Sequence, residues 1–112
     1  LDVSSEFRKR RRRQIDHDVP VVDTMTGTTV GRIGNLSESG MLLVSSLHLV
    51  EDALYQFQFE LPGDPRPIEL GAHLLWEDGK DAPGTAWAGF RFIGVSEDAA
   101  RRLRHWIESD AA

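Results

Sequence analysis

Residues 54–61 read LYQFQFEL, and this stretch indicates the fold class more clearly than any other part of the chain. Its large apolar residues fall on every second position, with Gln or Glu between them: Tyr55, Phe57, Phe59 and Leu61. Alternation with a period of two places apolar side chains on one face of a β-strand. The breaker sequence PGDP follows at once. We therefore predict a half-buried strand that ends in a turn.

Short segments of similar character lie on both sides of this strand. We predict further strands over residues 19–25, 28–36, 41–44, 68–76 and 86–93. The first two are separated only by a short turn at Gly27, so they are expected to pair as a hairpin. The strand at 68–76 places four apolar residues on one face: Ile68, Leu70, Ala72 and Leu74.

The C-terminal segment changes from strand to helix periodicity. Ser96 is suited to cap a helix, and the acidic residues that follow it suit the positive end of the helix dipole. Four apolar residues then fall on one helical stripe: Ala99, Leu103, Trp106 and Ile107. Six short strands followed by one helix indicate an antiparallel barrel or sandwich rather than βαβ units. We assign Trp87 and Trp106 to its core, and favour the core for Trp76 as well.

Composition limits the class of protein. A chain of 112 residues with 40% hydrophobic and 28% charged residues is typical of one soluble globular domain. The absence of cysteine excludes disulfides, thiolate catalysis and cysteine-ligated zinc. The same absence suits a cytoplasmic location, which we expect. No apolar run approaches the ~18 residues of a membrane span, so we expect no membrane insertion. The chain begins at Leu1 rather than Met, which leaves open that it is part of a longer protein.

The net charge of −5 hides an uneven distribution. Residues 1–14 hold six of the 13 Lys and Arg residues and two of the 18 Asp and Glu residues. This segment therefore carries +4 and the rest of the chain carries −9. Adjacent cations repel one another, so we predict a flexible basic arm over residues 1–14 and a folded domain over 15–112. The basic run indicates an anionic partner for the arm.

Catalytic signatures are missing from the sequence. The four histidines show no paired metal-ligand spacing, and neither a nucleophile elbow nor a phosphate-binding glycine loop occurs: His17, His48, His73 and His105. We therefore expect neither an enzyme nor a metal site or cofactor.

Two motifs remain, and they occur in a characteristic order. Arg8-x-x-x-Arg12 lies in the arm, and Asn35-x-Ser37-x-x-Gly40 lies in the turn before the strand at 41–44. Each motif alone is weak evidence, because basic runs and polar turns are common. Their order and spacing, together with the strand sequence WAGFRF at 87–92 and the terminal helix, resemble the PilZ domain family over residues 7–108.

The resemblance implies a six-stranded antiparallel β-barrel, mainly all-β, with a C-terminal α-helix. It also implies a bacterial receptor for the second messenger cyclic di-GMP. We expect the ligand to order the N-terminal arm over the barrel and so to alter a surface that a downstream protein partner binds. The implied ligand-binding residues are Arg8, Arg12, Asn35, Ser37 and Gly40, with Arg11, Arg13 and Trp76 as further candidates.

This ligand suits the chemistry of the two motifs. Arginine makes paired hydrogen bonds to phosphate oxygens or to guanine O6 and N7, and its flat face stacks on a base. Asn35 and Ser37 can bond a guanine edge or a phosphate, although both residue types also cap turns. Gly40 permits a close backbone approach. Lys9 and Arg13 share the four-residue spacing, but Lys lacks the forked geometry, so the register is assigned to Arg8 and Arg12.

Two alternative functions stay open at this point. One is a nucleic-acid-binding β-barrel whose arm follows a phosphate backbone, although the charge of −9 on the remainder argues against a nucleic-acid polymer. The other is a PilZ-like adaptor that docks proteins without binding a ligand. The sequence does not reveal the pathway, the ligand stoichiometry or the oligomeric state.

Overall fold

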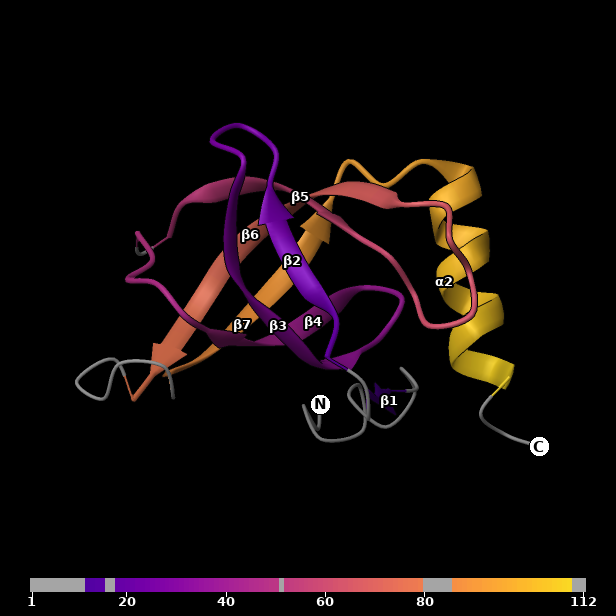
Figure 1. Cartoon of the computed structure of the whole chain (residues 1–112), viewed down its shortest axis with the longest axis horizontal. Coiled ribbons are helices and arrows are strands. Elements are labelled where there is room, and N and C mark those ends of the chain that lie inside the picture. Colours follow the sequence, from indigo (N-terminus) through magenta and orange to yellow (C-terminus); the bar gives the residue numbers. More distant parts are fainter. Residues whose placement is uncertain (1–11, 16–17, 51, 80–85, 110–112) are drawn as a thin grey trace, which may run out of the picture.

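The computed structural model describes residues 12–15, 18–50, 52–79 and 86–109. These residues form seven strands and one helix (Figure 1). The elements are β1 (Arg13–Gln14), β2 (Pro20–Asp23), β3 (Thr28–Leu36), β4 (Gly40–Ser45), β5 (Leu54–Phe59), β6 (Ile68–Asp78), β7 (Ala86–Ile93) and α2 (Glu97–Ser109).

Strands β2 to β7 close into an antiparallel barrel. Their order is β3-β2-β5-β6-β7-β4, and β4 pairs back with β3. The short strand β1 is an addition that pairs Arg13 with Leu36 and Gln14 with Asn35 at the end of β3. The predicted six-stranded barrel with a C-terminal helix is confirmed. Strand β1 was not predicted, because it lies in the basic run and has no apolar alternation.

The strand boundaries agree closely with the alternation of the sequence. The limits predicted for β3 and β7 are those observed, and β2 and β3 form the predicted hairpin. Strand β2 ends earlier than predicted, because Asp23 begins the turn. Its carboxylate accepts a hydrogen bond from the backbone N–H of Met25 at 2.9 Å, and its carbonyl accepts one from Gly27 at 2.7 Å.

The barrel interior is filled by the apolar faces of its strands. Phe57 of β5 and Phe90 of β7 meet edge to face, with 5.0 Å between ring centroids. The four apolar residues predicted for one face of β6 are all buried: Ile68, Leu70, Ala72 and Leu74. One irregularity follows them, since the register between β6 and β7 shifts between Leu74 and Trp76.

Two of the three tryptophans lie on the surface, and the core positions predicted for them are wrong. Trp76 is 49% exposed and Trp87 is 42% exposed, whereas Trp106 is buried as predicted. The register shift adds one residue to β6 and so turns Trp76 outward, against the simple alternation. Trp87 follows the alternation of β7, in which Ala86, Ala88 and Phe90 point inward.

Helix α2 packs against the barrel through the predicted stripe, which is buried: Ala99, Leu103, Trp106 and Ile107. The N-cap is also confirmed, because Ser96 Oγ accepts a hydrogen bond from the N–H of Ala99 at 3.1 Å. Arg102 anchors the helix to the β5–β6 loop through Asp64, with 2.9 Å between Nη2 and Oδ2. The hydrogen bond from Arg102, followed by one from the backbone of Arg66, holds the pKa of Asp64 below its ordinary value.

Within the segments that the structure describes, no helix has both the length and the apolar character needed to cross a bilayer.

Candidate functional site

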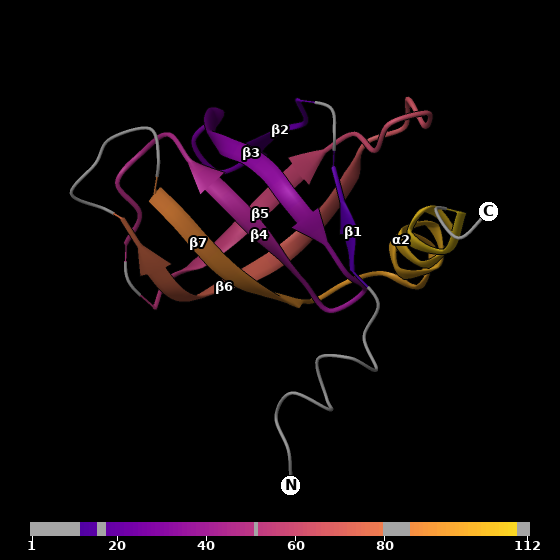
Figure 2. The same cartoon turned by 90° about the horizontal axis from the view of Figure 1, so that it is seen from below.

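Asn35, Leu42, Gly89 and Trp76 form one row across the outside of the barrel. Asn35 of β3 is opposite Leu42 of β4, Leu42 is opposite Gly89 of β7, and Gly89 is opposite Trp76 of β6. Directly opposed residues of neighbouring strands share a face of the sheet. These four residues, called the outer row below, cross the surface on which β3, β4 and β7 lie side by side (Figure 2).

A hydrogen bond joins the two sequence motifs at one end of this row. Nη1 of Arg12 donates to Oδ1 of Asn35 at 2.8 Å, across 23 positions of sequence. Asn35 is half-buried and Arg12 is exposed. Strand β1 sets this geometry, because its pairing with β3 brings Gln14 opposite Asn35. The guanidinium and the amide therefore lie together at the surface, where both can meet a polar ligand.

Ser37 shapes the turn between β3 and β4. Its side chain is fully buried. Its Oγ accepts hydrogen bonds from the N–H groups of Gly40 at 3.1 Å and Ser39 at 3.3 Å, and donates to the carbonyl of Gly40 at 3.2 Å. The backbone of Ser39 is also bonded to Phe92 of β7 at 2.8 Å. The hydroxyl is thus engaged inside the turn that follows Asn35.

Gly40 is required by a close contact between β4 and β7. A Cβ at this position would lie 2.3 Å from the carbonyl oxygen of Phe90, a separation that real Cβ atoms do not adopt. Any other residue would push β4 away from β7. Gly40 therefore has a structural role that fixes the turn relative to the outer row.

Trp76 ends the outer row with an exposed indole. Its ring lies on Gly89, where a Cβ would come within 2.2 Å of the indole Nε1. The glycine therefore lets the indole approach the backbone of β7, while about half of the side chain faces solvent. An exposed aromatic face of this kind is suited to stack on a planar base.

Arg13 points away from the outer row, toward helix α2. Its Nη1 donates to the carbonyl oxygen of Trp106 at 2.7 Å and lies 3.1 Å from Oγ of Ser109. The Arg13 Cζ also lies 3.9 Å from the centroid of the Trp106 ring. Helix α2 reaches the turn as well, through an ion pair between Arg104 and Glu38. Arg8 and Arg11, the other predicted arm residues, lie outside the described residues.

Trp87, which we predict for the core from the sequence, is a surface residue near the site. The sequence of β7 does indicate the exposure of Trp87. Phe90 and Phe92 occupy alternate positions on the inner face, so Trp87 falls on the outer face. Its indole leans over Gly34, whose Cβ would lie 2.8 Å from Cζ3 of the ring.

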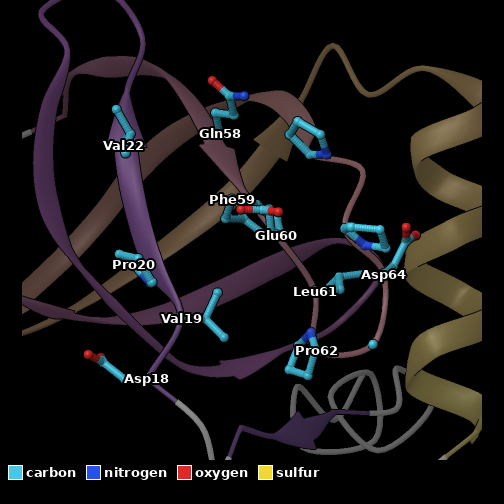
Figure 3. Close-up of a pocket in the computed structure, with 13 residues that line it drawn as sticks. Asp18, Val19, Pro20, Val22, Gln58, Phe59, Glu60, Leu61, Pro62 and Asp64 are labelled. Carbon is cyan, nitrogen blue, oxygen red and sulfur yellow. The ribbon is translucent and has the colours of Figure 1, made fainter.

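A large hollow lies elsewhere, next to the opening between β2 and β5. These strands pair at only two positions, Val22 with Gln58 and Asp23 with Phe57, and then separate. Side chains from both strands and from the segment after β5 surround a space of about 860 Å³ (Figure 3). Its ionisable lining residues are all acidic: Asp18, Glu60 and Asp64. Such a hollow does not suit an anionic ligand.

Comparison with known protein families agrees with this architecture. The model of the PilZ domain matches residues 6–109, which is nearly the whole chain. The chain belongs to the PilZ domain family. A comparison with curated protein sequences found no significant match.

Several solved structures share the fold. The inhibitor of motility MotI/DgrA of Bacillus subtilis superposes with a TM-score of 0.74 at 14% identity, over 92% of this chain and 50% of that one. YcgR of Escherichia coli in complex with c-di-GMP gives 0.73 at 22% identity, over 92% and 45%. The PilZ domain of YcgR with c-di-GMP gives 0.68 at 23% identity, over 90% and 88%. The chain spans about half the length of the first two proteins.

Proposed function

We propose that this PilZ domain is a receptor for cyclic di-GMP that binds the messenger at the outer row. The observation that carries the proposal is the hydrogen bond between Arg12 and Asn35, which unites the two motifs at one end of the row that the exposed indole of Trp76 ends. The site offers a guanidinium for phosphate or guanine, an amide for a base edge, and Trp76 for stacking. YcgR, which shares the fold, was solved with c-di-GMP.

In this proposal the motif residues have different tasks. Arg12, Asn35 and Trp76 contact the messenger, and Arg8 reaches it from the arm. Ser37 and Gly40 hold the turn, and the direct contact predicted for Ser37 would require its hydroxyl to leave its partners in the turn. Fixing the arm costs ~1–2 kcal/mol for each ordered residue, so charge-assisted bonds to the ligand must offset that cost.

In this proposal, ligand binding at the outer row changes the contacts of helix α2. Strand β1 carries Arg12 toward the outer row and Arg13 toward the C-terminal end of the helix. A ligand that draws Arg12 away from Asn35 therefore also acts on the contact between Arg13 and Trp106. The resulting change in the surface of arm and helix would be read by a downstream protein, which makes the domain an adaptor rather than an enzyme.

Calorimetric titration with cyclic di-GMP tests the proposal, with GMP and the linear dinucleotide as controls. We expect binding of the cyclic dinucleotide in preference to both controls, because it presents two guanines and two phosphates in one compact unit. A flat trace from folded protein would reject the receptor and favour an adaptor that only docks proteins. Binding of single-stranded DNA or RNA that persists near physiological salt would instead favour the nucleic-acid alternative.

A further inference from the structure

A second hollow lies on the outside of the barrel, next to the outer row. It has a volume of about 510 Å³, and its lining includes Gln14, Asp18, Arg32, Gly34 and Trp87. Gly34 immediately precedes Asn35, and Gln14 is paired with Asn35. The space, called the Trp87 hollow below, therefore begins one residue away from the proposed messenger site.

One wall of the hollow is an aromatic surface. Arg32, Val44 and Trp87 are opposed across β3, β4 and β7, so they share the outer face. The indole of Trp87 leans from β7 across β4 and rests on Gly34, which leaves no room for a Cβ there. With 42% of its surface exposed, Trp87 offers a planar partner that is already held in place by the backbone beneath it.

Two side chains of opposite charge line the same hollow as this aromatic surface. Arg32 and Asp18 are both exposed and both line the hollow. Neither side chain has a hydrogen-bond or ion-pair partner anywhere in the described part of the chain. Their hydrogen-bonding capacity therefore remains open to a ligand that enters the hollow.

This set of groups matches the two edges of guanine. Arginine donates two parallel hydrogen bonds to guanine O6 and N7. A carboxylate accepts from the guanine N1–H and N2–H groups on the opposite edge, and an indole stacks on the base plane. Adenine fits poorly, because its amino group would face the guanidinium and its N1 would face the carboxylate.

We propose that the Trp87 hollow is a guanine subsite, in which Trp87 stacks on a base while Arg32 and Asp18 bond its two edges. The proposal rests on the proposed function, because the base is a guanine of cyclic di-GMP held at the neighbouring outer row. It gives this domain a base-specific contact formed by strands of the barrel and by Asp18, which lies two residues before β2.

Calorimetric titration of variants tests the subsite. Trp87→Ala and Arg32→Ala should each weaken cyclic di-GMP binding by roughly fivefold to a hundredfold, the range expected for one lost stacking or charge-assisted contact. Trp87→Phe keeps an aromatic face and should retain most of the affinity. Met25→Ala and Arg101→Ala are matched controls, since these exposed side chains lie outside the hollow and should leave affinity unchanged.

Base selectivity gives a second readout that loss of folding would not produce. The parent should prefer cyclic di-GMP to cyclic di-AMP, and Asp18→Asn and Arg32→Ala should narrow that preference while thermal melting stays cooperative. If the parent binds cyclic di-GMP but Trp87→Ala, Arg32→Ala and Asp18→Asn bind it equally well, the subsite is wrong and the receptor function stands. If the parent does not bind, the receptor function itself fails and the subsite with it.

Discussion

Arg12 and Arg13 are neighbours in the chain, yet they belong to two different regions of the molecule. Arg12 bonds the side chain of Asn35 at the exposed end of the outer row. Arg13 bonds a backbone carbonyl of α2 and lies over the ring of Trp106, where it is half-buried. The two side chains diverge because successive residues of an extended segment point to opposite sides.

The difference separates a region built for binding from one built for stability. Around Arg12, the guanidinium and the amide of Asn35 lie at the surface, so a ligand can replace their bond to each other. Around Arg13, the guanidinium bonds the C-terminal end of a helix whose apolar face is buried, and cations at that position stabilise the helix. Removing one arginine should therefore change affinity, whereas removing the other should change folding.

The largest expected effect is on ligand affinity. Arg12→Ala and Asn35→Ala should each weaken cyclic di-GMP binding by roughly tenfold to a hundredfold, because a lost charge-assisted contact costs ~1.5–3 kcal/mol. The free energy of unfolding should change little, since both side chains are at the surface. Calorimetry and urea unfolding of the same preparations measure the two quantities, with Arg101→Ala as a control.

The opposite pattern would overturn the assignment of the motif. If Arg13→Ala and Lys9→Ala abolish binding while Arg12→Ala binds like the parent, the functional pair is Lys9 and Arg13. The contrast between the two sides of β1 would then be wrong.

The next largest effect is expected on stability. Arg13→Ala should lower the free energy of unfolding by about 1–2 kcal/mol, because it removes a charged hydrogen bond and a cation–π contact. Arg13→Lys should recover only part of this loss, since an ammonium cannot reproduce the planar contact with Trp106. Denaturant unfolding followed by tryptophan fluorescence gives both values. Equal stability of all three proteins would show that this contact does not hold the helix.

A smaller effect should distinguish the two polar residues of the second motif. Ser37→Ala removes a buried hydroxyl that three bonds engage in the turn, so it should lower the free energy of unfolding by about 1 kcal/mol. Its effect on affinity should be weaker than that of Asn35→Ala. Should Ser37→Ala abolish binding with unchanged stability, the hydroxyl contacts the messenger directly.

The smallest effect concerns the α2 anchor at low pH. The pKa of Asp64 is lowered in the folded state, so its contribution to stability is complete above the unfolded-state value of 3.8. That contribution is lost as the pH falls below this value through the lowered pKa. Urea unfolding from pH 6 to pH 3 should show the parent and Asp64→Asn converging in stability. If the free energies of unfolding of the two proteins differ by the same amount at every pH, the ion pair between Asp64 and Arg102 contributes nothing to stability.

The sequence predicted the regular parts of the molecule well, because the physics there is local. Alternation located six strands, and the 3.6-residue stripe located the helix and its buried face. The alternation wrongly placed Trp76 in the core. The register shift in β6 that turns it outward depends on the partner strand and is not visible in the local sequence pattern. The alternation also missed β1, whose pairing is set by β3 rather than by the basic run itself.

The sequence predicted which residues belong to the candidate site, but not which of them face a ligand and which hold the turn. Two short motifs identified Arg12 and Asn35, and the fold brings them into contact. That Ser37 is buried in the turn, and that Gly40 is required by the carbonyl of Phe90, follow from contacts between β4 and β7 that are remote in sequence. The Trp87 hollow likewise draws on four separate segments of the chain.

Mapping cyclic di-GMP binding by backbone and indole NMR shifts tests the central claim most directly. Titration of the labelled parent should shift the amides of the outer row (Asn35, Leu42, Gly89 and Trp76) together with the indole N–H of Trp76. Residues around the acidic hollow between β2 and β5, such as Val22 and Gln58, should shift little. Shifts confined to that hollow, or a spectrum unchanged at saturating messenger, would contradict the placement of the receptor site on the outer face of the barrel.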